Sequence, residues 1–368
     1  MAKKTGILSM QRIRNYGSFL QAYGLKQILE DLGSEVQFVD YHPGETLITS
    51  EEGTGLNRKI SKVRNALIQG GPITEKFRFI RHKRNFAKNT YAYLGITQEW
   101  NYSPELDLLI VGSDEVFNCV QSNTNVGFSP ELFGQKQKAR TRISYAASFG
   151  NTTLEKLKEH GVDSVIADWL MEFDALSVRD KNSGEIVKAL TGRQPLYHLD
   201  PVLIYDFVSQ CKKQPDNVPK DKAYLLLYGY PGRFTKEECL TIRKYADSKR
   251  LKIICIGGLQ ACCDRFIDAG PFEVISYFLN ADCIVTDTFH GTILSVITHR
   301  QFVSMVRESG YSNSQKMTDL MERLELRDRR LSSIDELEKI EERIEYEKTD
   351  QIIAAERMRT REYFQMYL

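Results

Sequence analysis

A histidine stands where a strand pattern gives way to a helix pattern in "CIVTDTFHGTILS", residues 283–295. An imidazole beside the free amides of a helix N-terminus is suited to proton transfer next to a bound phosphate or carboxylate. His290 is therefore a candidate general acid, with Asp287 a candidate base and Thr288 a candidate helix cap. The alternative is a structural histidine, which is the commoner use of a lone imidazole.

Two adjacent acids follow another apolar strand pattern, in "IVGSDEVFN". Gly112 allows a turn there, and Ser113, Asp114 and Glu115 bring three polar groups to one strand end. One ionised carboxylate raises the pKa of its neighbour, and this would supply a general base. Capping of a following helix is an alternative of equal weight.

Two further strand ends carry groups that bind anions. The first strand feeds the first helix through Asn15, Tyr16, Gly17 and Ser18. Free amides and the helix dipole favour an anion or a sugar hydroxyl at such a place, although simple capping explains the residues as well. In "LSVRDKNSG", Arg179 ends a strand and offers a planar fork to a carboxylate or phosphate. An ion pair with Asp180 or with a neighbouring domain is the alternative.

The elements that must position these residues alternate between strand and helix. A first series has strand patterns at 5–10, 35–41, 106–112, 142–148 and 175–180, with a helix at 18–33. A second has strands at 223–230, 251–258, 282–287 and 301–306, with helices at 236–250, 271–281 and 291–299. This alternation predicts an α/β fold of two doubly wound, Rossmann-like domains facing across a cleft. Ligands bind beyond the carboxyl ends of such strands.

Two segments depart from the alternation. Residues 44–105 show little strand signal, and residues 56–92 hold ten Lys and Arg against one acid, Glu75. We interpret this stretch first as a solvated helical insertion, and second as a surface that approaches an anionic membrane or a lipid-phosphate acceptor. Residues 333–366 contain neither Pro nor Gly. They predict one long helix, capped by Ser333, that packs back across both domains.

Composition excludes several classes of protein. The 368 residues carry a formal net charge of +1, so overall charge gives no argument for nucleic acid. No apolar run approaches the roughly 18 residues of a membrane span, and the N-terminus lacks a signal-peptide pattern. Seven cysteines include no CxxC pair. We therefore expect reduced thiols, no metal site and a cytoplasmic location.

Six motifs in this order resemble the polysaccharide pyruvyl transferase family: "NYGSFLQAYGLKQIL", "DLLIVGSDEVFN", "ISYAASFG", "LSVRD", "LDPVLI" and "TDTFHGTILS". The resemblance covers about residues 5–305. It implies a GT-B-like architecture and transfer of pyruvate from phosphoenolpyruvate to a sugar as a ketal, in making a capsule or exopolysaccharide. The expected parts are an acceptor-side domain at 1–200, a donor-side domain at 201–332 and a returning helix at 333–368.

The resemblance also implies roles for single residues. By motif matching, His290 is the catalytic or donor-binding histidine and Arg179 holds the acidic groups of the donor. Asp114 or Asp287 is the expected base. The expected substrate-binding residues are Arg179, Thr288, Gly291, Thr292, Asn15, Tyr16, Gly17, Gly112, Ser113 and Ser148. Many family members have an arginine where this chain has Thr288, so either Arg12, Arg14 or Arg233 replaces it or the donor differs.

The expected partners follow from the same resemblance. Phosphoenolpyruvate serves as a substrate, and no cofactor is expected. The saccharide acceptor is expected to be lipid-linked, with the protein peripheral at the inner face of the membrane through the basic insertion, and no nucleic acid is involved. Two other functions stay open: a GT-B-type glycosyltransferase that uses a nucleotide sugar, and a non-catalytic sugar- or phosphate-binding relative.

Overall fold

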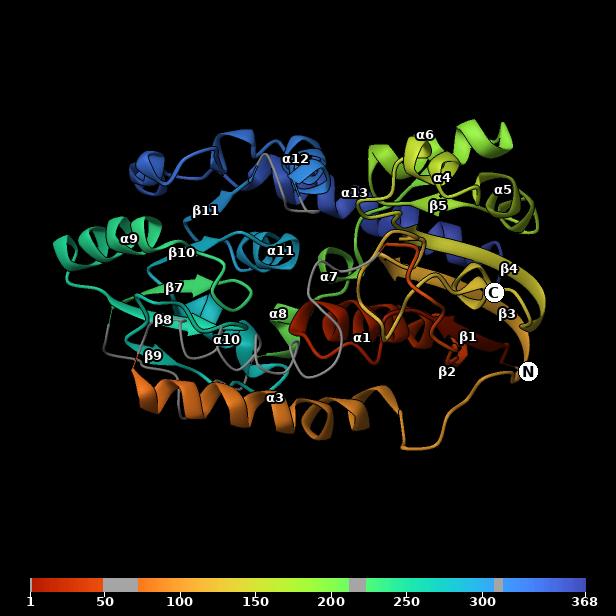
Figure 1. The fold of residues 1–368 in the computed structure, drawn as a ribbon, viewed down its shortest axis with the longest axis horizontal. Coiled ribbons are helices and arrows are strands. Elements are labelled where there is room, and N and C mark those ends of the chain that lie inside the picture. Colours follow the sequence, from red (N-terminus) through yellow and green to blue (C-terminus); the bar gives the residue numbers. More distant parts are fainter. Residues whose placement is uncertain (1, 49–71, 212–222, 308–313) are drawn as a thin grey trace.

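Two parallel β-sheets organise the protein (Figure 1). A computed structural model describes residues 2–48, 72–211, 223–307 and 314–368. Each sheet has six strands, in the orders β2-β1-β3-β4-β5-β6 and β12-β11-β10-β7-β8-β9, and every strand pairing is parallel. The predicted fold class, two doubly wound α/β units, is confirmed.

The first sheet lies wholly before residue 200. Its strands are β1 (Lys4–Leu8), β2 (Glu35–Phe38), β3 (Glu105–Asp114), β4 (Lys138–Ala147), β5 (Ser177–Val178) and β6 (Leu196–Tyr197). Its helices are α1 (Tyr16–Asp31), α3 (Ile73–Leu94), α4 (Leu154–Glu159), α5 (Asp163–Met171) and α6 (Lys181–Thr191), with the 3-10 helix η1 (Pro130–Phe133). Successive residues of β3 enter different core clusters, with Leu108 and Ile110 in one and Leu109 and Val111 in the other. Burial on both faces explains why this strand reads as a continuous apolar run.

The second sheet follows a short connection through α7 (Pro201–Ile204) and α8 (Phe207–Gln210). Its strands are β7 (Tyr224–Tyr228), β8 (Lys252–Ile256), β9 (Arg265–Phe266), β10 (Cys283–Thr286), β11 (Phe302–Met305) and β12 (Arg330–Leu331). Its helices are α9 (Lys236–Ser248), α10 (Glu273–Asn280), α11 (Phe289–Ile297) and α12 (Ser314–Arg323), with the 3-10 helix η2 (Arg327–Arg329). The seven cysteines are free thiols, as expected.

The basic insertion contributes α3, which runs along one side of the molecule, beneath the second sheet and α1 (Figure 1). Its Glu75 carboxylate accepts a hydrogen bond of 2.7 Å from the amide of Phe266 in the second sheet. Near its other end, the Tyr91 hydroxyl donates to the carbonyl of Arg12 in the first half, at 3.1 Å. The described part of the insertion therefore forms a helix over Ile73–Leu94, and this helix ties the two halves together. Residues 56–71 of the basic stretch lie outside the described residues.

The prediction of a single C-terminal helix is wrong. Ser333 does cap a helix, but this is the 3-10 helix η3 (Ile334–Glu341), and α13 (Glu347–Gln365) starts separately. Side chains of η2 and of the residue before β11 hydrogen-bond to backbone groups between these two helices. Arg329 and Gln301 donate to the carbonyl of Glu342, at 3.0 and 2.7 Å, and Gln301 accepts from the Ile344 amide at 3.0 Å.

Helix α13 returns to the first sheet, as predicted. The Tyr363 hydroxyl donates to the Ser144 carbonyl of β4 at 2.8 Å, and Tyr145 and Thr360 share a hydrogen bond of 3.0 Å. Among the described residues, no helix has the length and apolar character needed to cross a membrane.

Candidate active site

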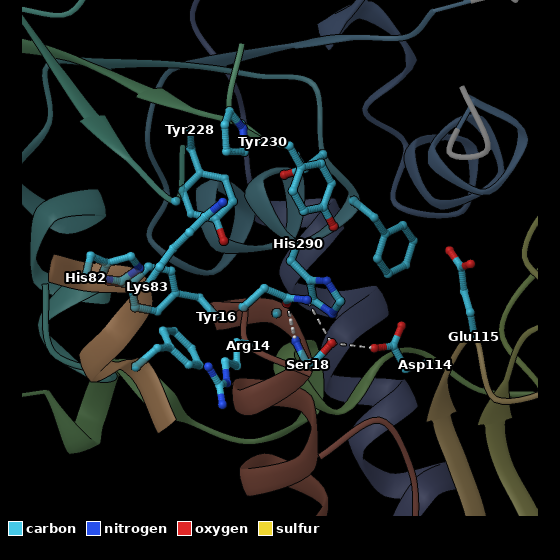
Figure 2. A pocket seen from close by; sticks show the side chains of 18 of the residues that line it. Arg14, Tyr16, Ser18, His82, Lys83, Asp114, Glu115, Tyr228, Tyr230 and His290 are labelled. Atoms are coloured by element: carbon cyan, nitrogen blue, oxygen red, sulfur yellow. Dashed lines mark hydrogen bonds between the residues drawn. The ribbon is translucent and has the colours of Figure 1, made fainter. Parts of the chain in front are cut away.

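A cavity of about 260 Å³ lies where the carboxyl ends of strands from both sheets meet (Figure 2). The β1–α1 turn, the end of β3, the end of β7 and the start of α11 contribute to its wall, together with α3 and α12. This is the edge at which parallel α/β sheets bind ligands. Its lining residues are Arg14, Asn15, Tyr16, Gly17, Ser18, His82, Lys83, Phe86, Asp114, Glu115, Tyr228, Gly229, Tyr230, Pro231, Gly257, Thr288, Phe289, His290 and Lys316.

His290 lies centrally in this cavity, with Tyr228 and Tyr230 to one side of it (Figure 2). Its Nε2 is 3.6 Å from Oδ2 of Asp200 and makes no hydrogen bond within the described part of the chain. A Cβ added to Gly17 would lie 2.2 Å from its Nδ1, so the imidazole packs directly on the first turn of α1. Its side chain is 13% exposed. The ring is thus held in place between α1 and Asp200, with Nε2 buried beside that carboxylate.

Arg179 lies behind the cavity wall rather than in it, so its expected role in holding the donor stays a prediction. Its side chain is 2% exposed and does not line the cavity. One amino group of the guanidinium donates to Oδ2 of Asp200 at 2.9 Å, and the other donates to Oδ1 of Asp114 at 3.2 Å. Arg179 does form an ion pair, which was the alternative interpretation, but its partners are Asp200 and Asp114 rather than Asp180. Arg179 therefore links the carboxylate beside His290 to the carboxylate in the cavity wall.

Asp114 lines the cavity as predicted, but its electrostatics differ from the expectation. Burial acts to raise the pKa of Asp114, yet Arg179, His290 and Lys316 outweigh it and hold the pKa below its usual value. Burial likewise acts to raise the pKa of Glu115, and Lys316 chiefly outweighs it. The prediction that one acid raises the pKa of the other to make a base is therefore wrong. Nearby cations keep both acids ionised.

Asp287 is placed away from the cavity, which corrects its assignment as a base. Its carboxylate lies 2.9 Å from Nε of Arg233 and 3.3 Å from Nε of Arg307, and its side chain is wholly buried. Burial outweighs these cations and raises the pKa of Asp287. Arg233 also lies outside the cavity wall, so it does not replace the missing family arginine there.

The residues at the start of α1 both cap the helix and line the cavity. Asn15, Tyr16 and Gly17 all line the cavity. Asn15 is the N-cap of α1 and accepts from the Ser18 amide at 2.8 Å. The Ser18 hydroxyl donates to Oδ2 of Asp114 at 2.9 Å (Figure 2). Capping therefore positions the turn, and the same turn forms part of the cavity.

At the start of α11, Thr288 lines the cavity but Gly291 and Thr292 do not. Thr288 is the N-cap, and its side chain accepts from the Gly291 amide at 3.0 Å. The Thr292 amide donates to the Thr288 carbonyl at 3.0 Å. The amides of Gly291 and Thr292 are therefore already hydrogen-bonded within the helix, and substrate binding by these two residues stays a prediction.

Gly112, Ser113 and Ser148 make contacts inside the fold and lie outside the cavity wall, so their role in substrate binding stays a prediction. A Cβ on Gly112 would lie 2.2 Å from the carbonyl oxygen of Tyr145, so glycine permits the close approach of β3 and β4. The Ser113 hydroxyl donates to a buried glutamine of α1 at 2.6 Å. The Ser148 hydroxyl donates to Asp180 at 2.6 Å. None of the three lines the cavity.

Cations from three separate elements line the cavity, and they bear on the family arginine that is absent at Thr288. Arg14, Lys83 and Lys316 line the cavity, and only Arg14 was among the proposed replacements. Arg12, another proposed replacement, instead makes two hydrogen bonds to Asp40, at 2.6 and 2.7 Å. Lys83 and Lys316 belong to helices far apart in the sequence, so their spacing does not predict that they line the same cavity.

A second histidine in the wall was also missed. Nδ1 of His82 lies 2.8 Å from Oδ1 of Asp268, and its ring stacks on Tyr16 with centroids 5.4 Å apart. Burial lowers the pKa of His82 and outweighs the opposing effect of Asp268. His82 is therefore neutral at physiological pH. No cluster of metal-ligating side chains occurs among the described residues.

A family model, polysaccharide pyruvyl transferase, matches residues 15–309. The chain belongs to this family. The protein is therefore a member of an enzyme family of transferases in polysaccharide biosynthesis, as the sequence motifs indicated. No curated protein sequence matches the chain.

Several solved structures share the general arrangement. The UDP-GlcNAc 2-epimerase of Neisseria meningitidis bound to UDP-GlcNAc is 9% identical, with a TM-score of 0.47 over 99% of this chain and 100% of that one. An epimerase-like protein of Listeria monocytogenes is 12% identical, with a TM-score of 0.44 over 98% and 97%. A Thermobaculum terrenum O-GlcNAc transferase mutant is 10% identical, with a TM-score of 0.42, and this chain covers 66% of it. At these scores the likenesses carry no conclusion about function.

Proposed function

We propose that this polysaccharide pyruvyl transferase family member moves pyruvate from phosphoenolpyruvate to two hydroxyls of a saccharide, forming a cyclic ketal. The observation that supports this most directly is the small cavity in which His290, Asp114 and three cations meet. Phosphoenolpyruvate is a three-carbon molecule with two acidic groups. Arg14, Lys83 and Lys316 supply the cationic groups that a carboxylate and a phosphate require.

The chemistry assigns a role to each side chain. His290, as its imidazolium, protonates the methylene carbon of the donor, and C2 becomes cation-like. A sugar hydroxyl adds to C2 and gives its proton to a base, for which Asp114 is the ionised candidate in the wall. The C2–O bond to phosphate then breaks, the second hydroxyl closes the ketal, and its proton leaves with the phosphate. The products are the pyruvylated sugar and inorganic phosphate.

Position favours His290 as the acid. It projects from the first turn of α11, packs on α1 and bears a nitrogen with no hydrogen bond in the described chain. Asp200 lies 3.6 Å from that nitrogen.

Replacing His290 tests the proposal. His290→Asn should reduce ketal formation by roughly 10²–10⁴-fold, the usual contribution of a general acid. Formation of the ketal methyl group can be followed by NMR, and phosphate release by a colorimetric assay. Wild-type turnover by this variant would refute the assignment of His290.

Ligand-induced thermal stabilisation separates the proposal from its alternative. Phosphoenolpyruvate should raise the unfolding midpoint of the wild-type protein and of His290→Asn, since only a ligand of the native state stabilises it. Stabilisation by nucleotide sugars, with no response to phosphoenolpyruvate, would favour a glycosyltransferase instead.

A further inference from the structure

A second and larger cavity, of about 1190 Å³, adjoins the first along α3. Arg14 lines both cavities, so the two meet at its side chain. The second cavity, which we call the cationic groove, is formed by Arg12, Ile13, Arg14, Asp40, Tyr41, Pro43, Arg84, Ala87, Lys88, Tyr91, Ala92, Ile96, Thr97, Gln98, Trp100, Asn123 and Asn125. A ligand held there would lie beside Arg14, which also borders the candidate active site.

The charge of the groove favours an anion. Arg14, Arg84 and Lys88 form no ion pair with any residue that the structure describes. Asp40, the carboxylate in the wall, is engaged by Arg12 through two hydrogen bonds. Three cations thus face the groove without an internal counter-charge, and arginine in particular matches the oxygens of a phosphate.

The remaining wall suits a saccharide. Trp100 is 54% exposed, and the guanidinium of Arg12 lies 4.2 Å from the centroid of its ring. This contact holds a large aromatic surface in a fixed position at the groove. Asn123, Asn125 and Gln98 add side-chain amides, which both donate and accept hydrogen bonds as sugar hydroxyls require.

We infer that the cationic groove binds the acceptor, as a saccharide that carries a phosphate or diphosphate. The inference rests on the proposed function in one respect: it assumes that the donor binds in the first cavity. An acceptor bound near Arg14 would then have its hydroxyls beside that donor. The phosphate has two sources, a water-soluble sugar phosphate or the headgroup of a lipid-linked saccharide. The outer face of α3 bears on this choice, since Ile73, Phe77 and Ile80 are 71%, 69% and 45% exposed next to the cations.

Binding of inorganic pyrophosphate and glucose 1-phosphate, measured by calorimetry without any donor, tests the groove directly. Arg84→Ala/Lys88→Ala should weaken both by roughly tenfold, since charge-assisted contacts to phosphate are lost. Neither residue lines the donor cavity. The matched control is Lys158→Ala/Arg361→Ala, which removes the same charge from exposed positions outside both cavities and should bind as wild type does. Unchanged binding by Arg84→Ala/Lys88→Ala, or equal affinity for methyl glucoside and glucose 1-phosphate, would overturn the inference.

A vesicle assay distinguishes the two sources. Phosphatidylcholine vesicles carrying a polyprenyl diphosphate glucose should bind the wild-type protein, and Phe77→Ser/Ile80→Ser should lose this binding but keep glucose 1-phosphate binding. Absence of wild-type binding to these vesicles, with glucose 1-phosphate binding retained, would assign the groove to the soluble form. The donor is tested separately by the thermal response to phosphoenolpyruvate. Loss of that response alone would reject the proposed donor and leave the groove standing.

Discussion

At the scale of single residues, a chain of charges runs from the cavity into the fold. His290 faces Asp200, Asp200 accepts from Arg179, and Arg179 donates to Asp114. Arg179 is thus a positioning residue, since it fixes two carboxylates, one beside the imidazole and one in the wall. The sequence motif identifies Arg179 as a candidate. Whether its side chain faces a ligand or the interior depends on how the fold buries it, and residue spacing does not predict burial of this kind.

Removing this arginine should be costly. Arg179→Met leaves Asp114 and Asp200 buried without their shared cation, and breaking a buried pair in this way costs about 3–5 kcal/mol of unfolding free energy. The pKa of each carboxyl should rise, so the loss should be larger at pH 8, where both are ionised, than at pH 5. Urea unfolding at the two pH values measures it, with the exposed Arg361→Met as control. A loss below 1 kcal/mol, or one independent of pH, would contradict this account.

At the scale of elements, two helix starts from opposite halves meet at the site. The first turn of α1 carries Gly17, and the first turn of α11 carries His290, which packs against it. The contact is so close that the position of the imidazole depends on the absence of a side chain at residue 17.

Gly17→Ala should therefore impair activity more than folding. The added Cβ would lie 2.2 Å from Nδ1 of His290, so the ring or the helix must move. A misplacement near 1 Å costs roughly 10²-fold in rate, whereas alanine itself favours a helix. Ketal formation should fall by about that factor with the circular dichroism spectrum unchanged. Gly270→Ala, whose Cβ would meet nothing nearer than 3.6 Å, is the matched control. Equal activity of the two variants would show that the close contact is unimportant.

Helices and strands could be predicted from the sequence where the residues of the segment itself determine them. Local sequence predicted two strands, at 106–112 and 282–287, and three helix caps, at Asn15, Thr288 and Ser333. Each of them forms where expected. The break between η3 and α13 could not be predicted because side chains of Arg329 and Gln301, outside that segment, cause it.

The candidate site shows the same limit. His290, Asp114 and the α1 turn lie at strand ends, so topology alone brings them together. Lys83 and Lys316 reach the cavity only through the packing of α3 and α12. Long-range packing of this kind leaves no periodic signal in one sequence. The charge of the basic stretch is evident in the sequence, but no local sequence pattern predicts that part of this stretch borders the site.

At the scale of the whole molecule, α13 closes the fold over a buried histidine. His198 lies against the rings of Tyr145 and Tyr363, with centroids 5.3 and 4.7 Å away, and its Nδ1 is 2.7 Å from the Ser177 hydroxyl. Burial, followed by the charges of Arg359 and Arg323, lowers the pKa of His198 to about 3. The junction between the first sheet and the C-terminal helix therefore requires a neutral imidazole.

This predicts how stability depends on pH. The pKa of His198 is lower in the native state than the roughly 6.5 of an unfolded chain, so its contribution is complete above pH 6.5 and is lost as the pH falls. Between pH 7.5 and pH 5 the loss should be about 2 kcal/mol of unfolding free energy, measurable by urea titration. His82, whose pKa is also lowered, acts in the same direction.

His198→Gln should flatten this dependence because no proton is then taken up at that position on unfolding. His160→Gln, at an exposed position, should keep it. The test compares the difference in unfolding free energy between pH 7.5 and pH 5 for each protein, so a constant loss of packing in His198→Gln cancels. An unaltered pH difference in His198→Gln would show that this histidine is not the group that links protonation to the docking of α13.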